Sequence, residues 1–314
     1  MKAIQLTRSS SSASPTISLV TMPTPNVPQG HALVQILYSY IHPSDKLNAR
    51  GLYPTTTFPR VPGRDYSGIV VDITSDRGEA KGWIGKEVYG SSGSALGYTS
   101  DGPHAQYFVI PVDALVEKPS SLSVLQAATV GVPYATALLC LRRAQTRKED
   151  VVLAMGCQLV LSAGRRADPS LDVLLESEDV ASTLQSRIPD LTGQNRVDVV
   201  IDTVGNIGLM SAAISQLAVG GRYAWIAAPR GDVSKKSTVD IFQAYRKAIQ
   251  PVGCNSNLPT MVEVADELRL LGRWFDEGLL KVADDRSFSV VALADAIEQG
   301  YTKTAGGRVV IGMA

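Results

Sequence analysis

Cysteine is scarce in this sequence. The 314 residues contain three, Cys140, Cys157 and Cys254, and no two of them form a Cys-x-x-Cys pair. An odd and scattered set argues against the disulfide framework of a small secreted protein and against a structural zinc site. A chain of this length also buries enough surface to hold a core without disulfides or metal. We therefore expect a protein of a reducing compartment, the cytoplasm.

Surplus charge and long apolar runs are missing too. Thirty Lys and Arg residues balance 30 Asp and Glu residues, so no excess charge is available to attract nucleic acid or an anionic membrane. The N-terminus has no apolar run of seven or more, and nowhere do 18 apolar residues follow one another, which argues against a signal peptide and a transmembrane helix. The 45% apolar and 19% charged composition is that of a soluble globular protein. We expect its main partner to be a small molecule.

Strand signals dominate the first 125 residues. Short apolar runs at 33–38, 68–73 and 87–90 are separated by clusters of Pro, Gly, Ser and Asp, which is typical of β structure. Helical spacing of apolar residues begins at Ser123. The first part of the chain is therefore predicted to be rich in strands, and helices are predicted after it.

Between residues 150 and 260, apolar runs alternate with helical stretches. The runs lie at 151–155, 158–161, 197–201 and 222–226. They lack polar alternation, as do strands of a parallel sheet that is covered on both faces. This section is predicted to be a doubly wound α/β domain.

The last part of the chain returns to mixed structure. An amphipathic pattern predicts a helix at 261–278, followed by a helix near 293–301 and a closing strand at 308–311.

Several stretches, in order along nearly the whole chain, resemble one enzyme family. They are Val-Pro-Gly-Arg-Asp-Tyr-Ser-Gly at 61–68, the turn at 101–107, Gln-Ala-Ala-Thr at 126–129, Asp-Val-Val-Ile-Asp-Thr-Val-Gly at 198–205, Gly-Gly-Arg at 220–222 and Gly-Cys-Asn-Ser at 253–256. Together they resemble the medium-chain dehydrogenase/reductase superfamily, and within it the zinc-free quinone oxidoreductase and enoyl reductase branch. Agreement in the right order makes the likeness far more specific than any single glycine motif.

The resemblance implies an α/β protein of two domains. A GroES-like β-barrel catalytic domain, residues 1–125 completed by 261–314, would surround a Rossmann-type nucleotide-binding domain at 126–260. Members of that branch transfer hydride from NADPH to the β-carbon of a conjugated carbonyl compound or to a quinone. The resemblance also implies a homodimer that pairs through the edge of the Rossmann sheet.

A zinc ion is not expected. Zinc-dependent relatives carry a cysteine within the segment at 40–45 and a Gly-His-Glu where this chain has Gly63, Arg64 and Asp65. Both ligands are replaced, and the four-cysteine structural zinc lobe is absent. Three histidines far apart in sequence do not supply an open catalytic zinc site unless folding gathers them.

A reductase without zinc must stabilise the developing enolate with hydrogen-bond donors and then protonate it. The resembling branch usually reads Asn-Pro-x-Asp where this chain has His42 to Asp45, so His42 replaces the asparagine and Asp45 matches the aspartate. His42 could donate to the oxyanion and serve as the proton source, because its ordinary pKa is about 6.5. It could equally be a strand-end histidine bonded to a backbone carbonyl.

Other polar side chains are weaker candidates for the catalytic site. Tyr66, Tyr98 and Tyr134 could act as donors, although a tyrosine at such positions more often packs with a satisfied hydroxyl group. Of these we take Tyr66, with His42 and Asp45, as the candidate catalytic set. His104 follows Gly102 and Pro103 and is predicted to be a turn residue.

The glycine-rich phosphate loop is missing. The first strand of a Rossmann domain should run into Gly-x-Gly-x-x-Gly and a helix, whose N-terminal amides receive the pyrophosphate. Here the run at 151–155 is followed by Gly156 and Cys157 and at once by the next apolar run. Neighbouring parallel strands need a crossover of a dozen or more residues, so the two runs are not expected to occupy their usual places.

Three explanations remain open for this shortening. The gene could have lost the loop and first helix, leaving a kink at Gly156 or an antiparallel hairpin; the sequence could be a shortened isoform or an engineered form; or one of the two runs is not a strand. Losing two or three charge-assisted amide bonds and the helix dipole removes about 4 to 8 kcal/mol. That is enough to turn a micromolar cofactor into a millimolar one.

Other marks of a cofactor site are present. Arg165 and Arg166 follow the second strand, where NADPH-preferring relatives place basic groups against the 2′-phosphate. The alternative interpretation is that they are a solvated pair in a loop. The resemblance assigns further cofactor contacts to Thr136, near the nicotinamide, and to strand-end residues. These strand-end residues are Thr203, Val204, Ala228, Cys254 and Ser256. Cys254 is interpreted as a small packing residue and not as a nucleophile, because no activating histidine is near it in sequence.

The sequence leaves three functions open. The first is an NADPH-dependent, metal-free reductase of an enone, enoyl thioester or quinone, and the remaining cofactor residues favour it. The second is a cofactor-free isomerase, cyclase or non-catalytic binding protein, which the missing loop favours. The third is an inactive dimer partner or scaffold.

Overall fold

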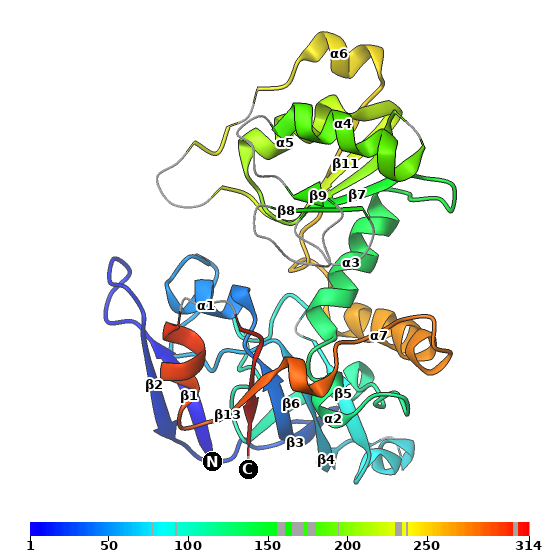
Figure 1. Cartoon of the computed structure of the whole chain (residues 1–314). Coiled ribbons are helices and arrows are strands. Elements are labelled where there is room, and N and C mark those ends of the chain that lie inside the picture. Colours follow the sequence, from blue (N-terminus) through cyan, green and yellow to red (C-terminus); the bar gives the residue numbers. More distant parts are fainter. Residues whose placement is uncertain are drawn as a thin grey trace. The chain divides into compact units, whose positions relative to one another are not determined.

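The structure, a computed structural model, describes the chain except for residues 77, 92, 156–160, 165–172, 175–179, 194, 230–233, 237, 304–306 and 314. The chain divides into two compact units, drawn in Figure 1. The first unit comprises Met1–Thr136 and Ser256–Ala314, and the second comprises Ala137–Asn255. The chain therefore passes between the units twice, once within helix α3 (Gly131–Arg143) and once after Asn255.

The first unit is built around a mixed sheet in which all strand pairs but one are antiparallel. The central strand β3 (His31–Tyr40) pairs with β4 (Asp65–Thr74) on one side and with β6 (Tyr107–Pro111) and β14 (Val309–Gly312) on the other. Outer strands β5 (Glu87–Gly90) and β13 (Ser289–Ala292) complete this sheet. The closing strand predicted at the C-terminus is thus β14, which brings the chain end beside β3.

The remaining elements of the first unit surround this sheet. Strands β1 (Lys2–Thr7) and β2 (Thr16–Thr21) form an antiparallel pair. The helices are α1 (Pro43–Ala49), α2 (Val124–Ala127) and α7 (Met261–Asp276), with short helical turns η1 (Gly78–Trp83), η2 (Val112–Ala114), η3 (Asp285–Ser287) and the π-helix η4 (Ile297–Thr302). Helix α7 occupies the predicted amphipathic segment and buries its apolar face. The second C-terminal helix is shorter than predicted and begins four residues later.

The second unit contains a parallel six-stranded sheet. Its strands are β7 (Val152–Met155), β8 (Leu161–Gly164), β9 (Val173–Leu174), β10 (Val197–Asp202), β11 (Leu217–Trp225) and β12 (Gln250–Gly253). They lie in the order β9-β8-β7-β10-β11-β12, which is the doubly wound order 3-2-1-4-5-6 of a Rossmann domain. Its helices besides the end of α3 are α4 (Val180–Thr192), α5 (Ile207–Ser215) and α6 (Ile241–Arg246).

Both faces of this sheet are covered. On one face, α4 and α5 pack on the strands (Figure 1) through a cluster that includes Leu184, Ile188 and Val200. On the other face, Cys140 of α3 and Ala144, the residue after α3, pack against β7 and β10. The apolar runs without polar alternation are explained by this double burial.

One expectation from the sequence, that the runs at 151–155 and 158–161 do not both take their usual places in the sheet, is wrong. The two strands are parallel neighbours, with Leu153 opposite Leu161 and Met155 opposite Ala163, whereas we expected that they could not both take their usual places. The link of about five residues reaches far enough: an extended chain covers about 3.3 Å per residue, and the return requires only two residues along the strand and a sideways step of about 4.8 Å.

None of the helices in the part of the chain that the structure describes is long and apolar enough to cross a membrane.

Candidate functional site

A buried polar cluster lies in the first unit where α1 begins. His42 is the N-cap of α1, with extended backbone before Pro43, and its N–H group donates to Oδ2 of Asp45 over 2.7 Å. The bond between the N-cap N–H group and the side chain three residues later is part of a capping box, which commonly starts a helix. Asp45 is only 2% exposed, and its burial raises its pKa to about 7, against the opposing effect of the Arg64 guanidinium.

Arg64 brings a permanent positive charge into this cluster. It immediately precedes β4 and is 4% exposed. Its guanidinium donates to Oγ of Ser44 over 3.3 Å and to Oδ1 of Asn257 over 2.9 Å, and it lies over the ring of Tyr98 at 5.7 Å. A fully buried cation needs such partners, because desolvation would otherwise outweigh its contribution.

Asp65, the next residue, is completely buried at the N-terminus of α3. Both of its carboxylate oxygens accept the N–H group of Val132 at 2.9 Å. A Cβ atom on Gly131 would lie 2.7 Å from the same carboxylate, so glycine permits this close approach. Burial raises the pKa of Asp65 to about 6, although the Val132 hydrogen bond and Arg64 favour the charged form.

The protonation of His42 differs from what its ordinary pKa indicates. Burial, followed by the nearby Arg64 charge, lowers the pKa of His42 to about 3. The imidazole is therefore neutral at pH 7 and does not carry a spare proton, although a neutral ring still has one N–H donor. Asp45 and Asp65, and not His42, are therefore the groups of this cluster whose pKa values lie near neutrality.

The three tyrosine candidates lie in different surroundings. Tyr66 is fully buried in the barrel, with its ring edge-on to Phe108 at 4.6 Å, and no partner for its hydroxyl group lies among the described residues. Tyr98 lies beneath Arg64. The Tyr134 hydroxyl group donates to the carbonyl of Lys281. Tyr66 thus has the surroundings of a packing residue, and Tyr98 is the tyrosine that contacts the polar cluster.

His104 was underestimated by sequence reasoning. It occupies a bend, as predicted, but its side chain is completely buried, with Nδ1 2.6 Å from the hydroxyl oxygen of Tyr301 and Nε2 3.2 Å from the carbonyl oxygen of Tyr40. Nε2 must therefore carry the hydrogen and Nδ1 must accept one from Tyr301. Burial lowers the pKa of His104 to about 4. No local pattern signals this contact, because its partner is 197 residues away.

Zinc does not fit this cluster. Among the described residues, no group of three or more His, Cys, Asp or Glu side chains could hold a metal ion. Arg64, at the position where zinc-dependent relatives carry a histidine ligand, offers no lone pair and would repel a cation.

The candidate cofactor residues of the second unit lie at the carboxyl ends of the parallel strands. Thr203 follows β10, and its hydroxyl group donates to the carbonyl of Met155 over 2.7 Å, which joins the ends of β7 and β10. The side chain of Asp202 accepts the N–H groups of Val204 and Gly205 at 2.8 and 3.0 Å. Gly205 has a φ of +70°, and a Cβ atom there would lie 2.6 Å from the backbone of Ala227.

This arrangement brings the loop after β10 close to the loop after β11, which contains Ala228. β7 and β10 flank the point where the strand order reverses, the position at which open α/β sheets bind ligands. Cys254, beyond β12, is buried in the core of this unit, as expected for a packing residue. Thr136 and Ser256 belong to the first unit. Arg165 and Arg166 lie outside the described residues.

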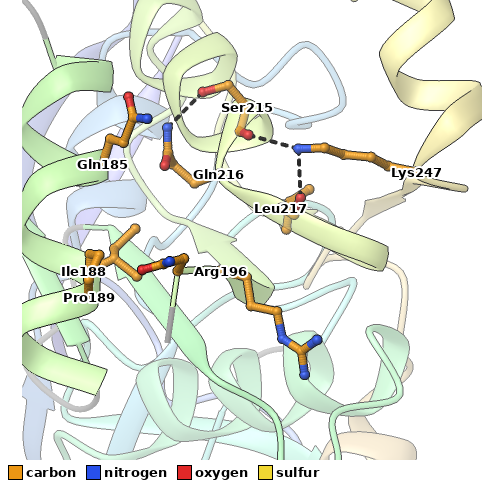
Figure 2. Close-up of a pocket in the computed structure, with 9 residues that line it drawn as sticks. Gln185, Ile188, Pro189, Arg196, Ser215, Gln216, Leu217 and Lys247 are labelled. Carbon is orange, nitrogen blue, oxygen red and sulfur yellow. Dashed lines mark hydrogen bonds between the residues drawn. The ribbon is translucent and has the colours of Figure 1, made fainter. Parts of the chain in front are cut away.

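A separate hollow of about 520 Å³ lies at the opposite, amino end of the strands (Figure 2). Residues that line it include Arg196 and Leu217, which lie at the starts of β10 and β11. Lys247 reaches across to the carbonyl groups of Ser215 and Leu217 at 3.0 and 2.9 Å. The first bond caps the C-terminal end of α5 and the second binds the start of β11, so the lysine has a structural role and the hollow is not the ligand edge of the sheet.

Family models match both parts of the chain. An alcohol dehydrogenase GroES-like domain matches residues 28–120, and a zinc-binding dehydrogenase domain matches residues 175–311. A zinc-type alcohol dehydrogenase-like protein of Schizosaccharomyces pombe is 36% identical, over 96% of this chain and 93% of that protein. Human quinone oxidoreductase is 22% identical over 71% of this chain and 78% of its own length.

Solved structures with the same fold cover the whole chain. An alcohol dehydrogenase superfamily protein from Novosphingobium aromaticivorans has a TM-score of 0.80 at 19% identity, covering 100% of both chains. An alcohol dehydrogenase from Escherichia coli, solved with NADH, has a TM-score of 0.78 at 17% identity, covering 100% of this chain and 99% of that one. At these identities the likeness shows the GroES-like and Rossmann-like fold.

Proposed function

Because the chain belongs to the medium-chain dehydrogenase/reductase superfamily, in its quinone oxidoreductase-like branch, we propose that it is a zinc-independent, NADPH-dependent reductase of a conjugated carbonyl compound. The chain is an oxidoreductase, as its relatives are. The substrate class we propose is an enone, an enoyl thioester or a quinone. The scattered cysteines support a cytoplasmic location.

The observation that carries the proposal is the cluster of His42, Asp45, Arg64 and Asp65. Arg64 places a fixed positive charge where a metal-dependent relative would hold a Lewis acid, and two buried carboxyl groups lie in its field. A positive charge and N–H donors are what an enolate oxygen requires. Zinc does not fit, so no step of this proposal uses it.

We assign different roles to His42 and Asp45. The neutral imidazole of His42 would donate an N–H hydrogen bond to the carbonyl oxygen of the substrate. Asp45, with a pKa of about 7, holds a proton that it could deliver to the enolate and take back from solvent near neutral pH. Tyr66 packs inside the barrel and is not given a contact with the substrate.

NADPH is the proposed hydride donor, and when bound it supplies the hydride that reduces the β-carbon. Thr203, Val204 and Ala228, which follow strands β10 and β11, support this proposal, because doubly wound sheets bind ligands at the carboxyl ends of their strands. Thr136, Cys254 and Ser256 remain proposed contacts on the resemblance alone. For the 2′-phosphate we propose Arg165 and Arg166.

Calorimetric titration tests the cofactor assignment. At micromolar protein, NADPH should release heat on binding, and NAD should give none. Replacing both Arg165 and Arg166 with alanine should weaken NADPH binding about tenfold to a hundredfold. The control is Arg187→Ala on α4, an exposed arginine near Asp190, which should leave the affinity unchanged. No heat with NADPH up to several millimolar would refute the reductase.

A second candidate function is favoured by the short link between β7 and β8. Five residues are too few to contain both a glycine-rich loop and a helix, so the usual pyrophosphate contacts cannot all be present. A cofactor-free isomerase or cyclase, or a non-catalytic binding protein, would keep the buried cluster and bind neither dinucleotide. The same titration separates the two candidates.

We also propose that the protein is a homodimer paired through β12. In the described part of the second unit, β12 is an edge strand of the sheet. The preceding helix α6 exposes three large apolar side chains, Ile241, Phe242 and Tyr245, which are 76%, 66% and 78% exposed. Apolar groups gathered beside an open sheet edge are typical of a subunit contact.

A further inference from the structure

Two buried cysteines lie near the first and the last residue of the second unit in sequence. Cys140 is in α3, close to where the chain enters this unit after Thr136, and Cys254 is the residue before Asn255, where the chain leaves it. Although 114 positions separate them in sequence, both side chains belong to the apolar cluster between α3 and the sheet. The exposed fractions of Cys140 and Cys254 are 1% and 5%.

The two thiol groups are direct neighbours. A side-chain hydrogen bond joins Cys140 to Cys254, and neither cysteine is part of a disulfide in the structure. The Cys254 backbone is held by the hydrogen bond from its N–H group to the carbonyl of Trp225 at 2.9 Å. The two side chains therefore approach each other within one cluster, from a helix and from an anchored strand end.

We propose that Cys140 and Cys254 form a reversible disulfide that joins the two segments by which the chain passes between its units. The oxidant is a low-molecular-weight disulfide such as oxidised glutathione. The thiolate of Cys254 attacks one of its sulfur atoms, forming a mixed disulfide and releasing one thiol. The Cys140 thiol then gives up its proton to solvent and displaces the second thiol. The two cysteines are oxidised and the small disulfide is reduced to two thiols.

Cys254 is the residue that reacts first. It lies between Gly253 and Asn255, which are both exposed, so the chain on both sides of this thiol faces solvent. The hydrogen bond from Cys140 lowers the pKa of the Cys254 thiol, burial opposes this, and the positive charge of Arg143 adds to the lowering. Cys140 has no such exposed neighbours on both sides and acts as the resolving thiol.

The disulfide would restrict the two connections between the units. Val132, on the α3 side, is bound by Asp65, and Asn257, after the second crossing, is bound by Arg64. A covalent bond between Cys140 and Cys254 would fix the separation of the same two segments at their other ends.

Thiol counting after oxidation tests the proposal. The full-length protein is incubated with oxidised glutathione, unfolded, and titrated with a chromogenic thiol reagent. The count should fall from three to one, and dithiothreitol should restore it. Peptide mapping of the oxidised protein should give one linked pair that contains Cys140 and Cys254.

Three variants separate the possible outcomes. Cys157→Ala should still lose two thiols, whereas Cys140→Ala and Cys254→Ala should lose none to an intramolecular bond. Alanine is small and apolar, so it suits the buried cluster. An unchanged count of three in the wild type, a pair that contains Cys157, or a stable glutathione adduct on Cys254 would overturn the proposal. None of these readouts depends on NADPH binding, so they test the disulfide independently of the proposed reductase function.

Discussion

The Arg64 guanidinium donates a 2.9 Å hydrogen bond to the side-chain oxygen of Asn257 and so holds the segment by which the chain re-enters the first unit. The adjacent Asp65 accepts the N–H group of Val132 and holds the start of α3, the segment by which the chain leaves that unit. Two consecutive residues thus combine a place in the candidate catalytic cluster with anchoring of both connections. Substitutions at either position should therefore affect stability as well as activity.

Replacing Arg64 with methionine should destabilise the first unit in a pH-dependent way. At pH 8 the variant leaves Asp45 and Asp65 ionised and buried without their cation, and removing one partner of a buried charge pair costs about 3 kcal/mol or more. Arg64 lowers the pKa of both carboxyl groups, so they take up protons more readily in the variant. The loss in free energy of unfolding should therefore be smaller at pH 5.

Urea unfolding at both pH values measures this difference. Asn257→Ala is the matched control, because it removes the hydrogen-bond acceptor and leaves the charge. Its cost should be about 1 kcal/mol and the same at both pH values. If the free energy of unfolding that is lost in Arg64→Met did not change with pH, Arg64 would not neutralise the two carboxyl groups.

Replacing Asp65 with alanine should remove the cap of α3. The N–H group of Val132 would lose its acceptor, and the free energy of unfolding should fall by about 1 to 2 kcal/mol. Asp65→Asn keeps an oxygen acceptor and should recover part of the loss. Thermal unfolding followed by circular dichroism distinguishes the two variants. Equal midpoints for Asp65→Ala and the wild type would contradict the capping role.

Much of the fold was predictable because its strands are buried on one or both faces. The apolar run at 197–201 is β10, and the run at 68–73 lies within β4. Burial leaves a pattern in the sequence, so such elements can be found without knowing their neighbours. The adjacency of β7 and β8 left no such pattern, because it depends on how far a short link must reach and not on the residues of the strands.

Sequence reasoning selected His42 and Asp45 as candidates, but it did not predict the electrostatics of the cluster in which they lie. His42 and Asp45 stand out by their place in the motif, but their pKa values depend on burial and on Arg64, which lies about twenty positions further along the chain. The contact between His104 and Tyr301 joins residues that a sequence pattern cannot relate. Tyr66 matched a motif, but only the surrounding strands show that its ring packs against Phe108.

Asp45 and His104 should affect the pH dependence of stability with opposite signs. The pKa of Asp45 is raised to about 7, so between about pH 4 and 7 the folded state keeps a proton that the unfolded chain has lost, and stability falls as pH rises. The pKa of His104 is lowered to about 4, so from about pH 4 to 6.5 the unfolded chain holds the extra proton and stability rises with pH.

Substitutions at these two positions should therefore change the pH dependence of the free energy of unfolding in opposite directions. Relative to the wild type, Asp45→Asn should gain stability steadily from pH 4 to 7, and the difference should level off above pH 7. His104→Gln should lose stability relative to the wild type from pH 4 to 6.5. Urea unfolding across this range provides the measurement, and two profiles that tilt in the same direction would show that one group is not buried as described.

The proposed dimer predicts that a charge on α6 separates the subunits. Phe242 is 66% exposed although it is large and apolar, and an aromatic side chain at the centre of an interface contributes about 2 kcal/mol or more to binding. Phe242→Asp should therefore raise the dimer dissociation constant about thirtyfold or more, since the aspartate would also have to be desolvated. Size-exclusion chromatography with light scattering over a range of concentrations measures the change.

Leu279→Asp is the control, because Leu279 is equally exposed, at 67%, but belongs to the first unit. If both variants keep the mass of a dimer, α6 is not at the interface, and a wild type that is monomeric at every concentration rules out the β12 pairing altogether.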